Sequence, residues 1–400
     1  MDEQKQPKKI EVLVGVLACL FLVVAVKLAI SWRPHFDLNF NFALPKFSWA
    51  SEEQKIASAP NVSAATTTVV EPIVPREKST VKVVKGIYLT ANSAASSKKI
   101  DEIIKLVDAT ELNAVVLDIK DYTGNILYDS KIPLVNELHT KRVVVKDYPA
   151  IIKKLHDHGI YVIARQTVFQ DPVLAVAKPE WAIKAKSGGI WHDQKGLSWV
   201  DETRHEVWDY DVAIAREAAD MGFDELNFDY VRFPTDGNMK NAVMPSSSAR
   251  NEVMKNFYHY LSDKLKDKPV YLSLDFFGLI MEVHDGMDIG QRIESASDAV
   301  DYISPMMYPS HYAKGQMGFA NPADHPGEIV NNGMKKGEPS FVDKRAVVRP
   351  WLQAFNLGAM YDATKIRAQI DAVEKYPNAG WLLWNASNRY TTAGLKIETK

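Results

Sequence analysis

The chain has 400 residues, a formal net charge of −2 and an ordinary globular composition, with ample length for a core. No basic patch or arginine-rich run stands out, so nucleic acid is not an expected partner. Cys19 is the only cysteine, which excludes an internal disulfide and a thiol or cysteine-zinc site.

The first 30 residues predict a membrane anchor. Residues 1–9 carry three lysines ahead of an apolar run over 10–30, and about 20 apolar residues span a bilayer as a helix. Lysines stay on the cytoplasmic side, which makes 1–9 a cytoplasmic tail and the rest of the chain extracytoplasmic. A cleaved signal peptide is the alternative, but Lys27 stands where a small-residue cleavage site would be. The sequence favours a single-pass protein of the cell membrane.

Residues 31–84 predict a flexible linker. They are rich in Ala, Ser, Thr, Pro and Val, as in "ASAPNVSAATTTVVEPIVPREKST", and they show no periodic apolar face. Such a composition buries too little apolar surface to fold alone. We therefore expect a solvated tether between the membrane and the domain that follows.

From residue 85 to residue 395, short apolar runs alternate with amphipathic stretches. The runs predict strands over 85–91, 113–121, 160–169, 225–234, 270–278, 301–309, 345–355 and 380–387. The stretches predict helices over 96–110, 148–158, 205–222, 246–267, 289–300, 326–336 and 362–376, with serines of "PSSSARNEV" as N-caps of the fourth. This alternation predicts an α/β fold of the (β/α)8 TIM barrel class. A doubly wound sheet is the alternative, but "NSAASSKK" after the first strand lacks its Gly-rich phosphate loop.

Strand side chains alternate between the two faces of a sheet, which permits a test of the barrel. If Asp229 points into the barrel, the same alternation places polar residues on the inward face near the carboxyl ends of most other strands. They are Tyr88 and Thr90, Asp118 and Lys120, Arg165 and Thr167, Asn227, Ser273 and Asp275, Ser304 and Tyr308, Arg349 and Gln353, and Trp384. Barrel active sites lie at the carboxyl ends of the strands, so this pattern indicates a site there.

Several long blocks resemble one known family. "GIYLTANSAA", "VIARQTVFQDPVLAVAKPEWAIK", "GFDELNFDYVRFP", "DYISPMMYPSHY" and "RPWLQAF" resemble the bacterial "putative glycoside hydrolase domain" family, over about residues 85 to 390. The resemblance implies a TIM barrel and a carbohydrate substrate. It leaves the catalytic roles open.

A fainter likeness to the family 18 chitinases shows a departure. "GFDELNFDY" parallels their "GFDGxDxDxE" pattern, and Asp229 matches its last aspartate. Val231 holds the position of the chitinase catalytic glutamate, which argues against that mechanism. Many retaining barrel glycosidases carry glutamates after strands four and seven; those are missing too, and "RPWLQAF" has Gln353 instead.

Glycoside hydrolysis needs two carboxyl groups flanking the scissile bond. Asp229 and Asp275 end adjacent predicted strands, which lie about 4.8 Å apart, and this makes them the expected catalytic pair. Asp118 is the reserve member. An arginine would favour the charged form of one carboxylate, and burial would favour the neutral form of the other. The alternative is a structural ion-pair network at the barrel mouth.

Other polar and aromatic residues near the strand ends are expected to bind a sugar, because aromatic rings stack on sugar faces. The candidates are Arg165, Arg232, Tyr308, His311, Arg349, Gln353, Trp191 and Trp384. No histidine and carboxylate set has metal spacing, so neither a metal nor another cofactor is expected.

The sequence thus predicts a membrane-anchored, extracytoplasmic glycoside hydrolase that acts on an envelope or exported polysaccharide. The alternatives are a non-catalytic carbohydrate-binding barrel and a structural envelope protein that uses the barrel face for protein contacts. The pattern carries no prediction of the sugar, the linkage, the stereochemical outcome or the oligomeric state.

Overall fold

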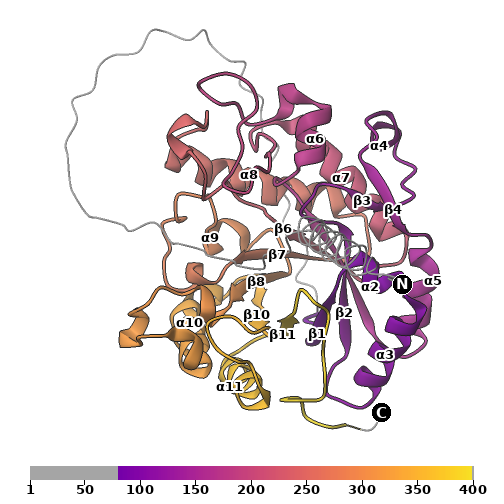
Figure 1. The fold of residues 1–400 in the computed structure, drawn as a ribbon, viewed down its shortest axis with the longest axis vertical. Helices are drawn as coiled ribbons and strands as arrows, with labels where there is room; N and C mark the ends of the chain where they lie inside the picture. The colour runs from indigo at the N-terminus through magenta and orange to yellow at the C-terminus, as the bar shows by residue number, and fades with distance from the viewer. Residues whose placement is uncertain (1–79, 399–400) are drawn as a thin grey trace, which may run out of the picture. The chain divides into compact units, whose positions relative to one another are not determined.

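The computed structural model describes residues 80–398. Within them, eight parallel strands close into a barrel, in the order β1-β11-β10-β8-β7-β6-β5-β2, with β2 pairing back onto β1 (Figure 1). The strands are β1 (Val84–Leu89), β2 (Ala114–Lys120), β5 (Tyr161–Thr167), β6 (Glu225–Asp229), β7 (Tyr271–Phe277), β8 (Tyr302–Met307), β10 (Trp351–Gln353) and β11 (Gly380–Trp384). All eight predicted strands are present, which confirms the (β/α)8 class.

Helices surround these strands (Figure 1). They are α2 (Ala91–Ala94), α3 (Ser97–Asp108), α4 (Pro133–Glu137), α5 (Tyr148–His156), α6 (Pro172–Ala177), α7 (His205–Asp220), α8 (Ser247–Leu265), α9 (Ile293–Ala296), α10 (Pro326–Gly337) and α11 (Ala363–Val373). Short 3-10 turns are η1 (Pro179–Trp181), η2 (Met239–Asn241), η3 (Gly278–Met281), η4 (Pro309–His311), η5 (Gln316–Gly318), η6 (Pro322–Asp324) and η7 (Glu338–Phe341). The helix predicted over 289–300 shrinks to α9. Ser246 is the N-cap of α8, but its side chain makes no capping hydrogen bond.

The seventh predicted strand is interrupted. The chain pairs with β8 first through β9 (Val347–Val348) and then through β10, and Arg349 and Pro350 separate the two. Proline has no N–H to give to a ladder, so the break lies where the sequence puts a proline inside a strand.

An excursion after β2 was not predicted. It contains β3 (Ile126–Tyr128), which runs antiparallel to β2, and β4 (Lys141–Val145), which runs parallel to β3. β3 has only three residues, too few for a period to appear in the sequence.

The inside of the barrel holds the predicted inward residues at most positions. The side chains that pack together there include Tyr88, Val116, Ile163, Trp351 and Leu382. The last four each lie two residues from a predicted inward residue of the same strand, as strand alternation requires. Lys120 is an exception, because the register of β2 against β5 shifts between Asp118 and Lys120. A bulge of this kind sends the next side chain to the other face, so the predicted shared face of these two residues is wrong.

The chain enters the barrel at its amino end. The Tyr271 hydroxyl donates to the Thr80 carbonyl (3.0 Å), and the Lys82 N–H donates to the Tyr302 hydroxyl (2.9 Å). Tyr271 and Tyr302 are the first residues of β7 and β8, so residues 80–82 lie at the end of the barrel opposite the strand termini that carry the aspartates.

The predicted tail, anchor and most of the linker, residues 1–79, lie outside the described residues. Between residues 80 and 398, none of the helices has the length and apolar character needed to cross a membrane.

Candidate active site

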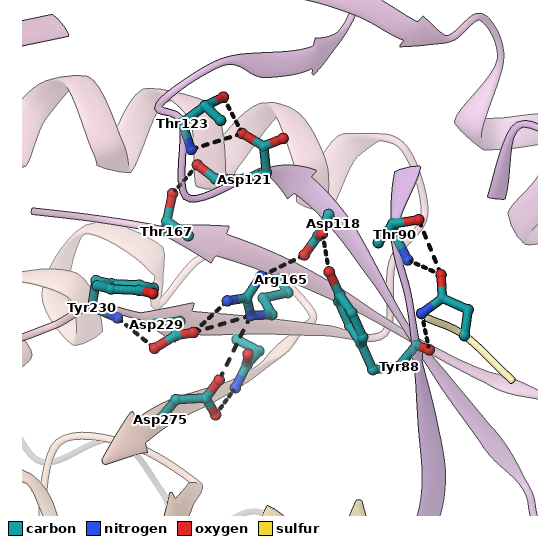
Figure 2. Close-up of polar contacts among 12 residues, drawn as sticks. Tyr88, Thr90, Asp118, Asp121, Thr123, Arg165, Thr167, Asp229, Tyr230 and Asp275 are labelled. Carbon is teal, nitrogen blue, oxygen red and sulfur yellow. Dashed lines mark hydrogen bonds and ion pairs between the residues drawn. The ribbon is translucent and has the colours of Figure 1, made fainter. Parts of the chain in front are cut away.

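Arg165 lies at the centre of a buried cluster of three aspartates (Figure 2). It stands on β5 between β2, which carries Asp118 opposite it, and β6, which ends in Asp229. Its Nη1 donates to Asp118 Oδ1 (2.6 Å), while Nε donates to Asp229 Oδ2 (3.2 Å) and Nη2 donates to the same oxygen. Burial acts to lower the pKa of Arg165, but the charges of Asp229 and Asp118 raise it well above its ordinary value. The guanidinium therefore stays charged.

The same guanidinium relates Asp229 to Asp275. Arg165 Nε lies 4.0 Å from Asp275 Oδ2 and 3.2 Å from Asp229 Oδ2. Because both distances start from one nitrogen, the two oxygens are separated by no more than their sum. That bound is compatible with the carboxyl separations of about 5 to 9.5 Å that glycosidases use. The two residues lie on the neighbouring strands β6 and β7, as their parity predicted.

Asp229 accepts hydrogen bonds on both oxygens. Oδ2 takes the two from Arg165, and Oδ1 takes one from the peptide N–H of Tyr230 (2.6 Å). Tyr230 has a φ of 55°, in the left-handed region that non-glycine residues seldom adopt. Such backbone strain concentrates at functional sites, and here it turns the peptide N–H that follows β6 back onto the carboxylate.

Asp275 lies deeper in the barrel, with 1% of its surface exposed. Its Oδ1 accepts hydrogen bonds from Asn227 Nδ2 (2.8 Å) and Trp351 Nε1 (2.8 Å). Burial, and next the charge of Asp229, raise the pKa of Asp275 to about 8. The Asp275 carboxyl group therefore keeps its proton at neutral pH, while Asp229 is hydrogen-bonded to the Arg165 guanidinium.

Asp118 completes the cluster from the other side of Arg165. Its Oδ2 accepts a hydrogen bond from the Tyr88 hydroxyl (2.5 Å). Burial raises the pKa of Asp118 to about 6, against the opposing effect of Arg165.

Aromatic rings border the cluster on the β1 and β11 side. Tyr88 and Trp384 stack with their ring centroids 3.9 Å apart, and the Arg165 guanidinium carbon lies 5.0 Å from the Trp384 ring centroid. Trp384 is half-buried, so part of its surface remains open. Tyr308 is 7% exposed, and burial followed by the charge of Asp275 raises its pKa. Trp384 and Tyr308 thus lie beside the aspartates, as the sequence predicted.

Three predicted site residues bond to partners other than the aspartates. Arg349 Nη1 donates to Glu225 Oε2 (3.0 Å) at the first residue of β6, toward the amino end of the barrel. Gln353 is fully buried and holds a loop, accepting from the Ser310 N–H (3.1 Å) and donating to the Phe355 carbonyl (3.0 Å). Trp191 is 2% exposed and donates to the Asn238 carbonyl (3.0 Å). Each of these three side chains is thus held by hydrogen bonds to groups other than the three aspartates.

His311 and Arg232 lie beyond the carboxyl ends of β8 and β6. The His311 ring is 5.4 Å from the Tyr308 ring, and burial lowers the pKa of His311 to about 4, which keeps it neutral. Arg232 follows Asp229 by three residues and is packed among aromatic rings.

Three residues of the site were not among the predicted site residues. Tyr88, Asn227 and Trp351 bond directly to the aspartates. Strand alternation put Tyr88 and Asn227 on the inward face, and that alternation was the available signal. The hydrogen bond from Trp351 to Asp275 depends on how β10 pairs with β8 and β11, which the sequence does not show.

Among residues 80–398, no group of three or more His, Cys, Asp or Glu side chains is placed to hold a metal ion. The cluster of three aspartates is instead organised around a guanidinium. It can hold one carboxylate charged and a neighbouring one protonated, which is the arrangement that acid–base chemistry on a glycosidic bond requires.

Residues 86–390 match the model of one protein family, described as "Putative glycosyl hydrolase domain". The chain belongs to this family. The match spans the barrel from β1 to beyond β11 and includes all three aspartates, and it confirms the resemblance seen in the sequence. None of the curated protein sequences matches the chain.

Solved structures share the fold. The glycoside hydrolase domain of PgaB (BpsB) from Bordetella bronchiseptica aligns with a TM-score of 0.55 and 12% identity, covering 76% of this chain and 94% of that one. TtGalA, an α-galactosidase from Thermus thermophilus in complex with stachyose, aligns with a TM-score of 0.51 and 11% identity, covering 80% and 65%. A hypothetical protein from Ruminiclostridium thermocellum is 37% identical over 47% of this chain and 96% of its own, with a TM-score of 0.44. At 11–12% identity, the first two establish the barrel architecture alone.

Proposed function

We propose that this family member is a membrane-anchored, extracytoplasmic glycoside hydrolase that cleaves an envelope or exported polysaccharide through Asp229 and Asp275. The observation that carries the proposal is the shared arginine. It holds Asp229 by two hydrogen bonds and lies within 4.0 Å of Asp275, so that two carboxyl groups of different protonation face each other across neighbouring strand ends.

The roles follow from the environments of the two groups. Asp229 accepts three hydrogen bonds, two of them from a cation, and is the carboxylate that acts as nucleophile or as base toward water. Asp275, whose pKa is raised to about 8, is the proton donor to the leaving oxygen. Trp384, which is half-buried and stacks on Tyr88, offers the aromatic surface on which a sugar ring stacks. Asp118 stays the reserve carboxylate, bonded to the opposite side of Arg165.

The anchor and the location rest on residues outside the described part of the chain. The lysines of residues 1–9 precede an apolar run over 10–30, and a Ser-, Thr- and Pro-rich stretch follows. A glycosyl hydrolase held on the outer side of a membrane meets polysaccharides of the envelope or polymers in export. That reasoning supplies the substrate class, without a sugar or a linkage.

Asp229→Asn tests the proposal. The parent protein and the variant are incubated with a panel of envelope glycans, and products are detected by mass spectrometry. We expect the variant to lose at least about 100-fold in cleavage rate while it still binds the glycan, because the carboxylate acts in the chemical step. Asp263→Asn is the matched control. Asp263 is an exposed aspartate of α8 paired with Lys266, and its replacement should leave the rate unchanged.

A non-catalytic carbohydrate-binding barrel is the second candidate. It is favoured by the fact that each of the three aspartates already has a hydrogen-bond partner in the cluster and none is more than 6% exposed. Glycan binding by the parent protein without any product from the panel would support this candidate over the enzyme.

A further inference from the structure

Arg232 is a second buried arginine at the carboxyl end of the barrel. It lies three residues beyond Asp229, the last residue of β6, and is 6% exposed. Its side chain has one hydrogen bond, from Nη1 to the Phe233 carbonyl (2.9 Å). Unlike Arg165, it is not used by the proposed chemistry.

Three aromatic rings fix the guanidinium in place. Its central carbon lies 4.6 Å from the centroid of the Phe277 ring, 5.0 Å from that of Trp199 and 5.4 Å from that of Tyr230. We call these three rings the Arg232 box. Ring faces attract a cation and hold the planar group without using its N–H donors.

The box adjoins the aspartate pair. Tyr230 is the residue after Asp229 and donates its peptide N–H to that carboxylate. Phe277 follows Asp275 by two residues on β7, so the two side chains leave the same face of the strand. Arg232 therefore lies one layer above the aspartates, farther along the carboxyl ends of β6 and β7.

The charge of Arg232 has no partner at contact distance. Among residues 80–398, no carboxylate oxygen lies within 4.0 Å of its nitrogens, and Nε and Nη2 donate to no acceptor. Both nitrogens keep some contact with solvent, because neither is one of the fully buried side-chain atoms that lack a hydrogen-bond partner. Burial lowers the pKa of Arg232, and the opposing influence of Tyr230, and next of Asp229 and Asp236, only partly offsets this.

The nearby buried glutamate does not supply the missing charge. Both carboxylate oxygens of Glu202 are sealed from solvent and accept no hydrogen bond among the described residues. Burial raises the pKa of Glu202 well above its ordinary value, so this group is neutral at neutral pH. A buried cation without a counter-ion is costly. A bound anion would supply the missing charge.

We propose that Arg232 and its aromatic box form a subsite for an oxyanion carried by the sugar next to the scissile bond, and that the substrate is an acidic glycan. The free Nε and Nη2 edge matches two oxygens of a carboxylate or phosphate. Phe277, which is partly exposed, lies beside it. The inference rests on the proposed carbohydrate function of the site and specifies its substrate class.

Matched glycan pairs test this subsite. Uronic-acid oligosaccharides are compared with their carboxyl-reduced counterparts, and phosphate-bearing oligosaccharides with dephosphorylated ones. Binding to the full-length protein is measured by calorimetry at one fixed ionic strength. We expect the acidic member of at least one pair to bind about 10- to 100-fold more tightly, the range that one charged, bidentate hydrogen-bonded contact supplies. The pair that shows the preference identifies carboxylate or phosphate as the anion.

Substitutions assign the preference to Arg232. Arg232→Gln should remove the discrimination between the acidic and the neutral member of a pair, while Arg232→Lys should keep part of it because the charge remains without the fork. Circular dichroism checks that both variants fold, and the lysine variant serves as the test if the glutamine variant does not.

The outcomes separate this inference from the proposed function. Equal binding of acidic and neutral glycans, binding of no acidic glycan, or discrimination that survives in both variants would overturn the subsite even if neutral glycans are cleaved. Charge-dependent binding without any cleavage would leave the subsite standing and remove the hydrolase.

Discussion

One guanidinium serves three carboxyl groups at the candidate active site. Arg165 bonds to Asp118 on one side and to Asp229 on the other, with Asp275 just outside hydrogen-bond distance. A single positive charge cannot balance three negative ones in a buried setting, so burial raises the pKa values of Asp275 and Asp118. The charge balance of the cluster itself assigns different protonation states to neighbouring groups.

The pH dependence of cleavage should report Asp275. A proton donor with a pKa of about 8 is protonated below that pH and loses its proton above it, so kcat/KM should fall on the alkaline side with a midpoint near pH 8. Trp351→Phe removes a hydrogen bond that favours the charged form of Asp275, which should raise its pKa. The alkaline limb of the pH–rate profile should therefore move to higher pH in this variant. A limb that stays in place or moves to lower pH would assign it to another group.

The same groups show what residue types and alternation predict. Asp229, Asp275 and Asp118 were expected at the carboxyl ends of their strands, and the structure brings them around one arginine. Their catalytic roles stay predictions. Arg349 and Gln353 have the expected parity, yet they bond to Glu225 and to the loop after β8. Parity gives the face of a strand but not the height of a side chain along the barrel axis, and the partner decides that.

At the scale of elements, a buried clamp fixes the bulge that ends β2. Lys120 is fully buried, and its Nζ lies 2.8 Å from Asp171 Oδ2 and 3.0 Å from Asp211 Oδ1. Asp171 is the N-cap of α6, and Asp211 belongs to α7. The lysine thus links the end of β2 to α6 and α7 on the outer side of the barrel, two residues after Asp118.

Removing this lysine should destabilise the fold. Lys120→Met leaves two buried carboxylates without their cation, and breaking such a pair costs about 3 to 5 kcal/mol in the free energy of unfolding. Lys154→Met is the control, because Lys154 pairs with Asp101 on the surface, where solvent screens the ion pair and its loss should cost little. Urea denaturation of both variants measures the difference. Equal losses of unfolding free energy in the two variants would show that the buried ion pairs of Lys120 stabilise the fold no more than a surface pair does.

Strand and helix prediction succeeded where a segment is long enough to show a period. The eight barrel strands and most long helices were expected within a few residues. β3, β4 and the Lys120 bulge were not, because a three-residue strand has no period and a bulge depends on the register of β2 against β5. The burial of Trp191 was not expected for a related reason. It arises from contact with residues 237–238, a loop that is distant in the sequence.

At the scale of the whole molecule, the predicted topology has a direct test. The lysines of residues 1–9 and the apolar run over 10–30 predict a barrel outside the cytoplasm, joined to the membrane through a linker that protease reaches. Protease added to intact spheroplasts should release the barrel as a soluble fragment, which an antibody against it detects. A cytoplasmic protein serves as the control for lysis. Complete protection of the barrel with an intact control would contradict this topology.

If the barrel is anchored as proposed, the contacts of residues 80–82 indicate which end of it faces the membrane. These residues lie against Tyr271 and Tyr302 at the amino ends of β7 and β8, whereas the aspartates lie at the carboxyl ends. If residues 31–84 form the flexible linker that the sequence predicts, they would have an end-to-end distance on the order of 40 Å and would join the barrel at the end opposite the aspartates. On the proposed topology we expect the aspartates to reach polymers away from the membrane surface, and we expect the barrel itself to keep them from glycan lying directly on that surface.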